Sequence, residues 1–94
     1  VSPETDRAIH ADEVFLLDSG AQSRDGTTDV TRTLWTGPRE APPAIRERYT
    51  RVLQGHLGLA ATRFPDGVAG PHLDAIARRA LWDVSQDYDH GTGH

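Results

Sequence analysis

The chain has 94 residues and a net charge of −4, and its 36% hydrophobic content is ordinary for one small globular domain. It contains no cysteine, which excludes disulfides, thiolate metal sites and cysteine catalysis, and no lysine, which excludes Schiff-base chemistry and a Walker-type phosphate loop. The arginines are scattered and no apolar stretch approaches about 20 residues, so we expect neither a nucleic-acid partner nor a membrane span.

The first half of the chain predicts a pair of β-strands after a polar connecting segment at residues 1–12. Residues 13–17 contain a short apolar run that is typical of a strand buried on both faces, and Asp18 ends it. The side chains of residues 29–35 fall into two alternating sets, as on the two faces of a strand, and many are β-branched. This pattern predicts a second strand. The glycine-containing connection over residues 20–28 indicates that the two strands pair antiparallel.

The second half predicts two helices. The first is expected to begin near Pro42 or Pro43, because proline is tolerated in the first turn of a helix, and to end before Pro65. Its apolar positions recur at helical spacing and include His56, which we therefore assign to a core or boundary position. A second amphipathic helix is predicted over residues 71–83.

A further strand is predicted over residues 88–94, which carry two glycines. The order strand, strand, helix, helix, strand indicates the α+β fold class. The chain starts at Val1 without a methionine and ends at His94 within what resembles a motif. We therefore expect both ends to be cuts, which would leave exposed the apolar surface that the rest of the domain covers.

Two aspartates are candidate metal ligands. Asp18 follows directly on the apolar run, where a carboxylate is costly to bury unless it is paired or bound to a cation. Asp29 stands eleven residues later, and opposed residues of an antiparallel pair have Cβ atoms about 4.5–5.5 Å apart. Two carboxylates that close repel each other unless a proton or a metal ion lies between them. The alternative is structural: Asp18 starts a turn and Asp29 caps a loop.

His90 and His94 flank a Gly-Thr-Gly sequence. On a strand, two imidazoles four residues apart share one face, and the glycines let backbone or substrate come close. A single histidine on a strand is more often structural, but two of them in a chain with paired carboxylates favour a metal or catalytic site. His10 and His72 lie in turn-like surroundings and are expected at the surface.

Several segments together resemble one enzyme family. They are Leu16–Gln22, Asp25–Thr33 and His90–His94, with the intervening Arg46–Leu53 and Leu73–Arg78. With the eleven-residue spacing of the aspartates, they resemble the catalytic domain of the Xaa-Pro aminopeptidases (aminopeptidase P), which are pita-bread metallopeptidases. The resemblance covers nearly the whole chain. It implies a partial pita-bread fold, with antiparallel strands packed against two helices.

The resemblance also implies roles for four residues. Asp18 would chelate one of two divalent metal ions, Asp29 would bridge both ions, and His94 would bind the other. His90 would line the site as a catalytic residue that helps to bind substrate. The two remaining ligands of the family, both glutamates, would follow the histidine motif. Carboxylate and imidazole ligands suit Mn²⁺, with Co²⁺ or Zn²⁺ as substitutes.

The activity that the resemblance implies is removal of an N-terminal residue that precedes proline, so the partner is a peptide substrate with proline at the second position. We expect residues 1–94 to be the N-terminal portion of the catalytic domain, truncated at both ends and inactive alone. No signal peptide is visible, and we expect a cytoplasmic location; the full-length protein could form oligomers. Two alternatives remain: a non-catalytic interaction module with the pita-bread fold, and a prolidase-type dipeptidase.

Overall fold

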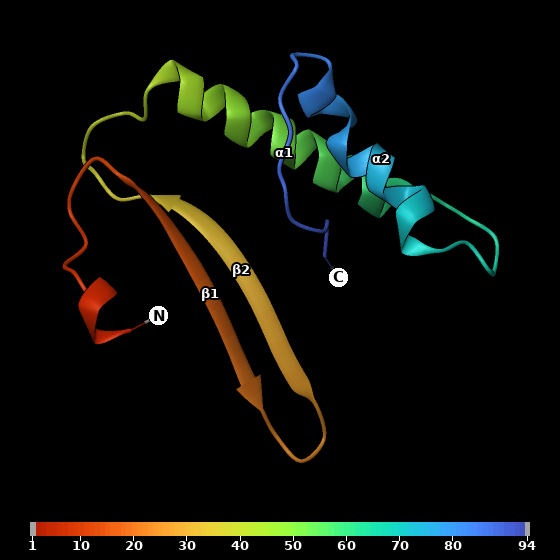
Figure 1. Ribbon diagram of the computed structural model, residues 1–94, viewed down its shortest axis with the longest axis horizontal. Helices are drawn as coiled ribbons and strands as arrows, with labels where there is room; N and C mark the ends of the chain where they lie inside the picture. Colours follow the sequence, from red (N-terminus) through yellow and green to blue (C-terminus); the bar gives the residue numbers. More distant parts are fainter. Residues whose placement is uncertain (1, 94) are drawn as a thin grey trace. The chain divides into compact units, whose positions relative to one another are not determined.

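The computed structural model describes residues 2–93. In chain order it contains a short 3-10 helix, Pro3–Thr5 (η1), two strands, Val14–Gln22 (β1) and Thr27–Trp35 (β2), and two helices, Pro43–Ala61 (α1) and Gly70–Trp82 (α2) (Figure 1). These elements form two compact units, one that ends at Ala41 and one that begins at Pro42. The first unit contains the β-hairpin and the second contains the helix pair. No helix in residues 2–93 combines the length and apolarity that a membrane crossing requires.

The antiparallel strand pair is confirmed, since β1 and β2 pair along all nine residues of each strand. The predicted end of the first strand is wrong, because β1 continues past Asp18 to Gln22. The chain turns between Ser23 and Gly26, where the N–H and the hydroxyl of Ser23 both donate to the Gly26 carbonyl, at 2.8 and 2.9 Å. Ladder hydrogen bonds to β2 thus outweigh the low intrinsic strand preference of the Asp-Ser-Gly stretch.

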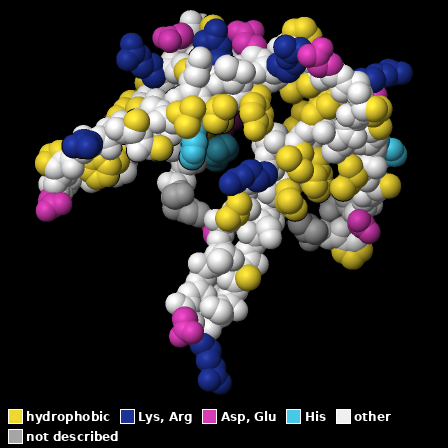
Figure 2. Space-filling view, turned by 180° about the vertical axis from the view of Figure 1, so that it is seen from behind, with side chains coloured by type: hydrophobic (Ala, Val, Ile, Leu, Met, Phe, Trp, Pro, Cys, Tyr) yellow, Lys and Arg dark blue, Asp and Glu magenta, His cyan; other side chains and the backbone are white. Residues whose placement is uncertain are grey.

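Both faces of the hairpin carry apolar side chains that are exposed. Leu16 is 62% exposed and Leu17, on the opposite face, is 43% exposed. The expectation of a strand buried on both faces is therefore wrong for this chain, whereas the expected uncovered apolar surface is confirmed. Besides the two strands and η1, the described residues of this unit contain no helix or strand that could cover either face of the hairpin. Hydrophobic side chains are also visible at the molecular surface in Figure 2.

The first helix begins where the sequence predicted, with Pro43 in its first turn and Pro42 just before it. Helix α1 ends at Ala61, because Thr62 has an extended backbone with φ −75° and ψ 128°. The residue before a proline is disfavoured in the helical conformation, so the chain leaves the helix before it reaches Pro65.

The second helix agrees with the predicted range of 71–83 to within one residue at each end, and it packs against α1. The buried core of this helix pair is small. Ala77 and Leu81 of α2 are 7% and 5% exposed, and Gly55 is the buried residue of α1. A Cβ atom at Gly55 would lie 2.0 Å from the carbonyl oxygen of Ala77. The absence of a side chain at Gly55 is therefore what lets the two helices approach this closely.

The buried face of α1 is centred on Gly55 and not on the apolar stripe that predicted a core position for His56. His56 is exposed, and Tyr49 of the same stripe is 51% exposed. The prediction for His56 is wrong because successive residues of a helix point about 100° apart, so the neighbour of a buried glycine turns away from the contact. His10 and His72 are exposed, as expected.

The strand predicted over residues 88–94 is not formed in its described part, residues 88–93. No strand among the described residues pairs with this segment. Side chains of α2 hold it instead, and their contacts are part of the candidate site. Residue 94 lies outside the described residues.

Candidate metal centre

Asp18 and Asp29 lie on the same face of the β-hairpin. Asp18 is opposite Thr31 and Asp29 is opposite Gly20. Because side chains alternate between the two faces along a strand, all four positions share one face. The sequence predicted that the two aspartates share a face, which is confirmed, and that they stand directly opposite each other, which is wrong. The two aspartates are diagonal neighbours, whose spacing in antiparallel pairs is about 7–8 Å and somewhat less between Cβ atoms.

Gly20 keeps this face of the hairpin open between the two aspartates. It is the next same-face residue after Asp18 on β1, and it stands across from Asp29 on β2. A Cβ atom at Gly20 would lie 2.9 Å from the carbonyl oxygen of Thr28, which is closer than Cβ atoms normally come. The position beside both carboxylates therefore has no side chain, and the backbone there resists acquiring one.

The two carboxylates fit a divalent cation in their chemistry. The hydroxyl of Thr31 donates to Oδ1 of Asp18 at 3.1 Å and orients that carboxylate. Like charges on one face repel each other, and a cation relieves that repulsion. Oxygen ligands suit Mn²⁺ and related ions. Within residues 2–93 no cluster of three or more Asp, Glu or His forms a metal site, so the hairpin supplies a pair of candidate ligands and not a complete set.

His90 lies in the segment that follows α2. Its ring stacks with that of Tyr88, with ring centroids 4.7 Å apart and 23° between the ring planes. Its Nδ1 lies 2.7 Å from the carbonyl oxygen of Gly91. A carbonyl only accepts hydrogen bonds, so Nδ1 carries the proton in this contact and Nε2 is the acceptor nitrogen of the neutral ring. The backbone therefore orients one ring nitrogen, and the other can meet a ligand.

Four residues that the sequence did not indicate as part of the site hold the segment around His90. Asp74 and Arg78 belong to α2, and Tyr88 and Thr92 belong to the segment itself. Arg78 donates from Nε to Asp74 at 2.7 Å and from Nη1 to Asp87 at 2.8 Å. The hydroxyl of Thr92 donates to the other oxygen of Asp74. One signal in the sequence could have found this group, because an aspartate and an arginine four residues apart on a predicted helix are typical of an ion pair.

These contacts shift the pKa values of the charged groups so that each favours its ionised form. The pKa of Asp74 is lowered, first by the hydrogen bond from Thr92 and then by that from Arg78. The pKa of Asp87 is lowered, first by the hydrogen bond from the Trp82 indole. The pKa of Arg78 is raised by its hydrogen bonds to Asp74 and Asp87. All three groups are therefore charged at neutral pH.

The residues expected in the site fall in both units of the chain. Asp18 and Asp29 belong to the unit that ends at Ala41, and His90 belongs to the other unit. The structure brings the two aspartates onto one face of the hairpin. His94, the third expected ligand, lies outside the described residues.

Comparison with known proteins agrees with the resemblance to Xaa-Pro aminopeptidases. The profile of metallopeptidase family M24 matches residues 1–94. The chain is 57% identical over 89 residues to the Xaa-Pro aminopeptidase ApepP of Drosophila melanogaster, covering 95% of this chain and 14% of that protein. It is 53% identical over 89 residues to Xaa-Pro aminopeptidase app-1 of Caenorhabditis elegans, covering 94% of this chain and 14% of that protein.

The fold has a solved counterpart. The X-prolyl aminopeptidase of Caenorhabditis elegans, described as a cytosolic enzyme with a di-nuclear active site, matches with a TM-score of 0.88 and 48% identity. The match covers 100% of this chain and 15% of that enzyme. The two antiparallel strands and two helices therefore correspond to a fragment of the pita-bread aminopeptidase fold. With a family profile that matches from end to end and relatives this similar, the chain belongs to metallopeptidase family M24.

Proposed function

We propose that this chain is the N-terminal portion of the catalytic domain of an Xaa-Pro aminopeptidase. The proposed reaction is hydrolysis of the peptide bond between an N-terminal residue and a following proline. The observation that carries the proposal is the pair Asp18 and Asp29 on one open face of a hairpin, in a chain that is 57% and 53% identical to two Xaa-Pro aminopeptidases. The cytosolic enzyme with a di-nuclear site that the chain resembles supports two metal ions and a cytoplasmic location.

This chain would hold the metal ions in part. Asp18 would chelate one ion, Asp29 would bridge both and His94 would bind the other, and two glutamates beyond His94 would complete the ligand set. Mn²⁺ suits this oxygen-rich set best, and Co²⁺ or Zn²⁺ would substitute for it. When bound, such ions supply polarisation of the scissile carbonyl and a water molecule activated at neutral pH.

The described residues would contribute orientation, access and substrate binding. The Thr31 hydroxyl donates to Oδ1 of Asp18 at 3.1 Å, which fixes the carboxylate and leaves Oδ2 for an ion. Gly20 keeps the adjoining position clear of side-chain atoms. His90, with its Nδ1–H donated to the Gly91 carbonyl, would present Nε2 as an acceptor for an N–H of the peptide.

The test compares the 94-residue chain with the complete protein on a peptide whose second residue is proline. The complete protein should release the N-terminal residue when Mn²⁺ is added and should stop when a chelator removes the metal. The 94-residue chain should release none, because two aspartates without the expected glutamates hold a metal ion loosely and leave the ligand set incomplete. Metal-dependent release by the short chain would contradict the second expectation. A complete protein that binds Mn²⁺ but cleaves nothing would overturn the proposal.

Substrate controls in the same assay separate the alternatives. A peptide with alanine in place of the second-position proline should be cleaved far more slowly than the proline peptide. A prolidase-type enzyme would cleave an Xaa-Pro dipeptide and leave longer peptides intact. A non-catalytic module would cleave none of the three substrates.

A further inference from the structure

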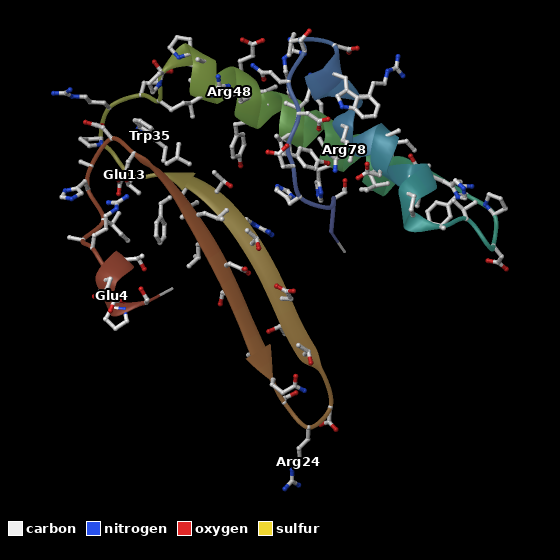
Figure 3. All side chains as sticks on the ribbon, in the orientation of Figure 1. Glu4, Glu13, Arg24, Trp35, Arg48 and Arg78 are labelled. Atoms are coloured by element: carbon white, nitrogen blue, oxygen red, sulfur yellow. The ribbon has the colours of Figure 1, made fainter. Side chains whose placement is uncertain are left out.

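Arg78 binds the backbone of the histidine segment at two points. Its Nη1 donates to the carbonyl of Tyr88 at 2.6 Å and its Nη2 donates to the carbonyl of His90 at 2.8 Å. Two carboxylates fix the guanidinium, since Asp74 accepts from Nε at 2.7 Å and Asp87 accepts from Nη1 at 2.8 Å. All three guanidinium nitrogens therefore have partners, and the side chain is only 13% exposed. Figure 3 labels Arg78 among the side chains of α2 and the segment that follows it.

Ring and hydroxyl contacts extend this arrangement along the segment. The guanidinium carbon of Arg78 lies 4.0 Å from the centre of the Tyr88 ring, in a cation–π contact. The Tyr88 ring also stacks with that of His90. The hydroxyls of Tyr88 and Thr92 lie 2.7 Å apart, and Thr92 donates to Asp74. Residues before and after His90 are therefore tied to α2 through one network.

The histidine segment depends on such contacts because it has no regular structure. Residues 88–93 form neither helix nor strand, and they include Gly91 and Gly93, the latter with φ of +92°. Glycine loses more conformational entropy on ordering than any other residue. A planar guanidinium serves two carbonyls and two carboxylates at once, whereas the compact ammonium of lysine cannot present the same fork of donors.

We propose that Arg78 is a positioning residue, which fixes residues 88–93, His90 among them, in the geometry that metal and substrate binding need. The identity of those ligands rests on the proposed function, whereas the contacts of Arg78 do not. The helix pair packs through other residues, Gly55, Ala77 and Leu81. Loss of Arg78 should therefore loosen the histidine segment without unfolding the helices.

The test uses the complete protein with Arg78→Gln and, as a matched control, Arg79→Gln. Arg79 is the next residue on α2 and is exposed. Without metal, amide hydrogens of residues 88–93 should exchange at least about tenfold faster in Arg78→Gln and at the wild-type rate in the control. The Kd for Mn²⁺, measured by electron paramagnetic resonance, should rise by about 10- to 100-fold in Arg78→Gln only, the range typical of groups that orient metal ligands.

Kinetics at saturating Mn²⁺ distinguish positioning from a general structural role. If Arg78 positions His90 for substrate binding, the KM of Arg78→Gln should rise by about tenfold while kcat stays within about twofold of wild type. A structural role alone would reduce the active fraction, which lowers kcat and leaves KM unchanged. Arg78→Lys should recover only part of the loss, because its ammonium cannot satisfy both carbonyls and both carboxylates.

A milder variant keeps the inference testable if Arg78→Gln does not fold. Thr92→Val removes the hydroxyl that contacts Asp74 and Tyr88, and it should also raise exchange in residues 88–93 and the Kd for Mn²⁺. The inference is overturned if these variants match Arg79→Gln in exchange, in Mn²⁺ affinity and in KM. A wild-type protein that binds no metal would instead overturn the proposed function, and the exchange data would still decide whether Arg78 holds the segment.

Discussion

Replacing Asp29 with asparagine in the complete protein is expected to lower kcat for an Xaa-Pro peptide by about a thousandfold or more. Metal ions contribute several kcal/mol to transition-state stabilisation, and each step of about 1.4 kcal/mol is a factor of ten in rate. Asp29 stands opposite Gly20 on the face that it shares with Asp18. Asparagine keeps the size of the side chain but brings no negative charge, so it cannot bridge two ions. Initial rates at saturating Mn²⁺ give the measurement.

The matched control for this substitution is Asp25→Asn, which makes the same chemical change on the same hairpin. Asp25 lies in the turn between β1 and β2 and is exposed, next to Arg24, which Figure 3 shows at the tip of the hairpin. Its loss should leave kcat within about twofold of wild type, as for most surface substitutions. If Asp29→Asn retained kcat within about tenfold of wild type with Mn²⁺ bound, Asp29 would not have the proposed role.

Gly55→Ala is expected to destabilise the protein by about 1–3 kcal/mol, the usual range for overpacking a tight contact. The added Cβ would lie 2.0 Å from the carbonyl oxygen of Ala77, a backbone atom that cannot rotate away. The two helices would have to separate, which would weaken the contacts of Ala77 and Leu81, the buried apolar side chains of the described core.

Gly58→Ala makes the same substitution in the same helix and should have the opposite sign. A Cβ atom at Gly58 would meet the Cγ2 of Ile76 at 3.7 Å, an ordinary contact distance. Alanine is favoured over glycine within a helix by about 0.5–1 kcal/mol, so this variant should be slightly more stable than wild type. Urea unfolding followed by circular dichroism measures both variants. Equal changes in stability at the two positions would contradict the close approach of α1 and α2 at Gly55.

The strand pair could be predicted from the sequence because local signals suffice for it. Residues 29–35 alternate in side-chain type and are rich in β-branched residues, and the connection contains glycine. The end of β1 could not be predicted, because Asp18 and Gly20 have little strand preference of their own. Their hydrogen bonds come from partners in β2 that a local pattern does not show.

The relative placement of the two aspartates depended on the length of the turn. Direct opposition of Asp18 and Asp29 would require Gln22 to pair with Asp25 across a two-residue turn. The observed pairing of Gln22 with Thr27 leaves four residues in the turn, which moves the register by two positions. A shift of two keeps both aspartates on one face, because side chains repeat with a period of two. The shared face could therefore be predicted, whereas the diagonal arrangement could not.

Both helices of the second unit were predicted, but the buried face of α1 and the conformation of the last segment were not, because contacts distant in sequence decide them. A hydrophobic pattern finds large apolar side chains, so it could not identify Gly55 as the buried point of α1. A strand needs a neighbouring strand to pair with, and no strand among the described residues pairs with residues 88–93. The segment is held instead by Arg78, whose spacing from Asp74 is a visible ion-pair signal but whose bonds to the carbonyls of Tyr88 and His90 leave no trace in the sequence pattern.

The most direct test of the metal assignment is anomalous X-ray diffraction at the manganese edge from crystals of the complete protein grown with Mn²⁺. The proposed site predicts two anomalous peaks about 3.5–4 Å apart on the face of the hairpin that is open at Gly20. The carboxylate of Asp29 should be bonded to both peaks and that of Asp18 to one of them. Peaks remote from this face, or a single peak that Asp29 does not bind, would contradict the assignment.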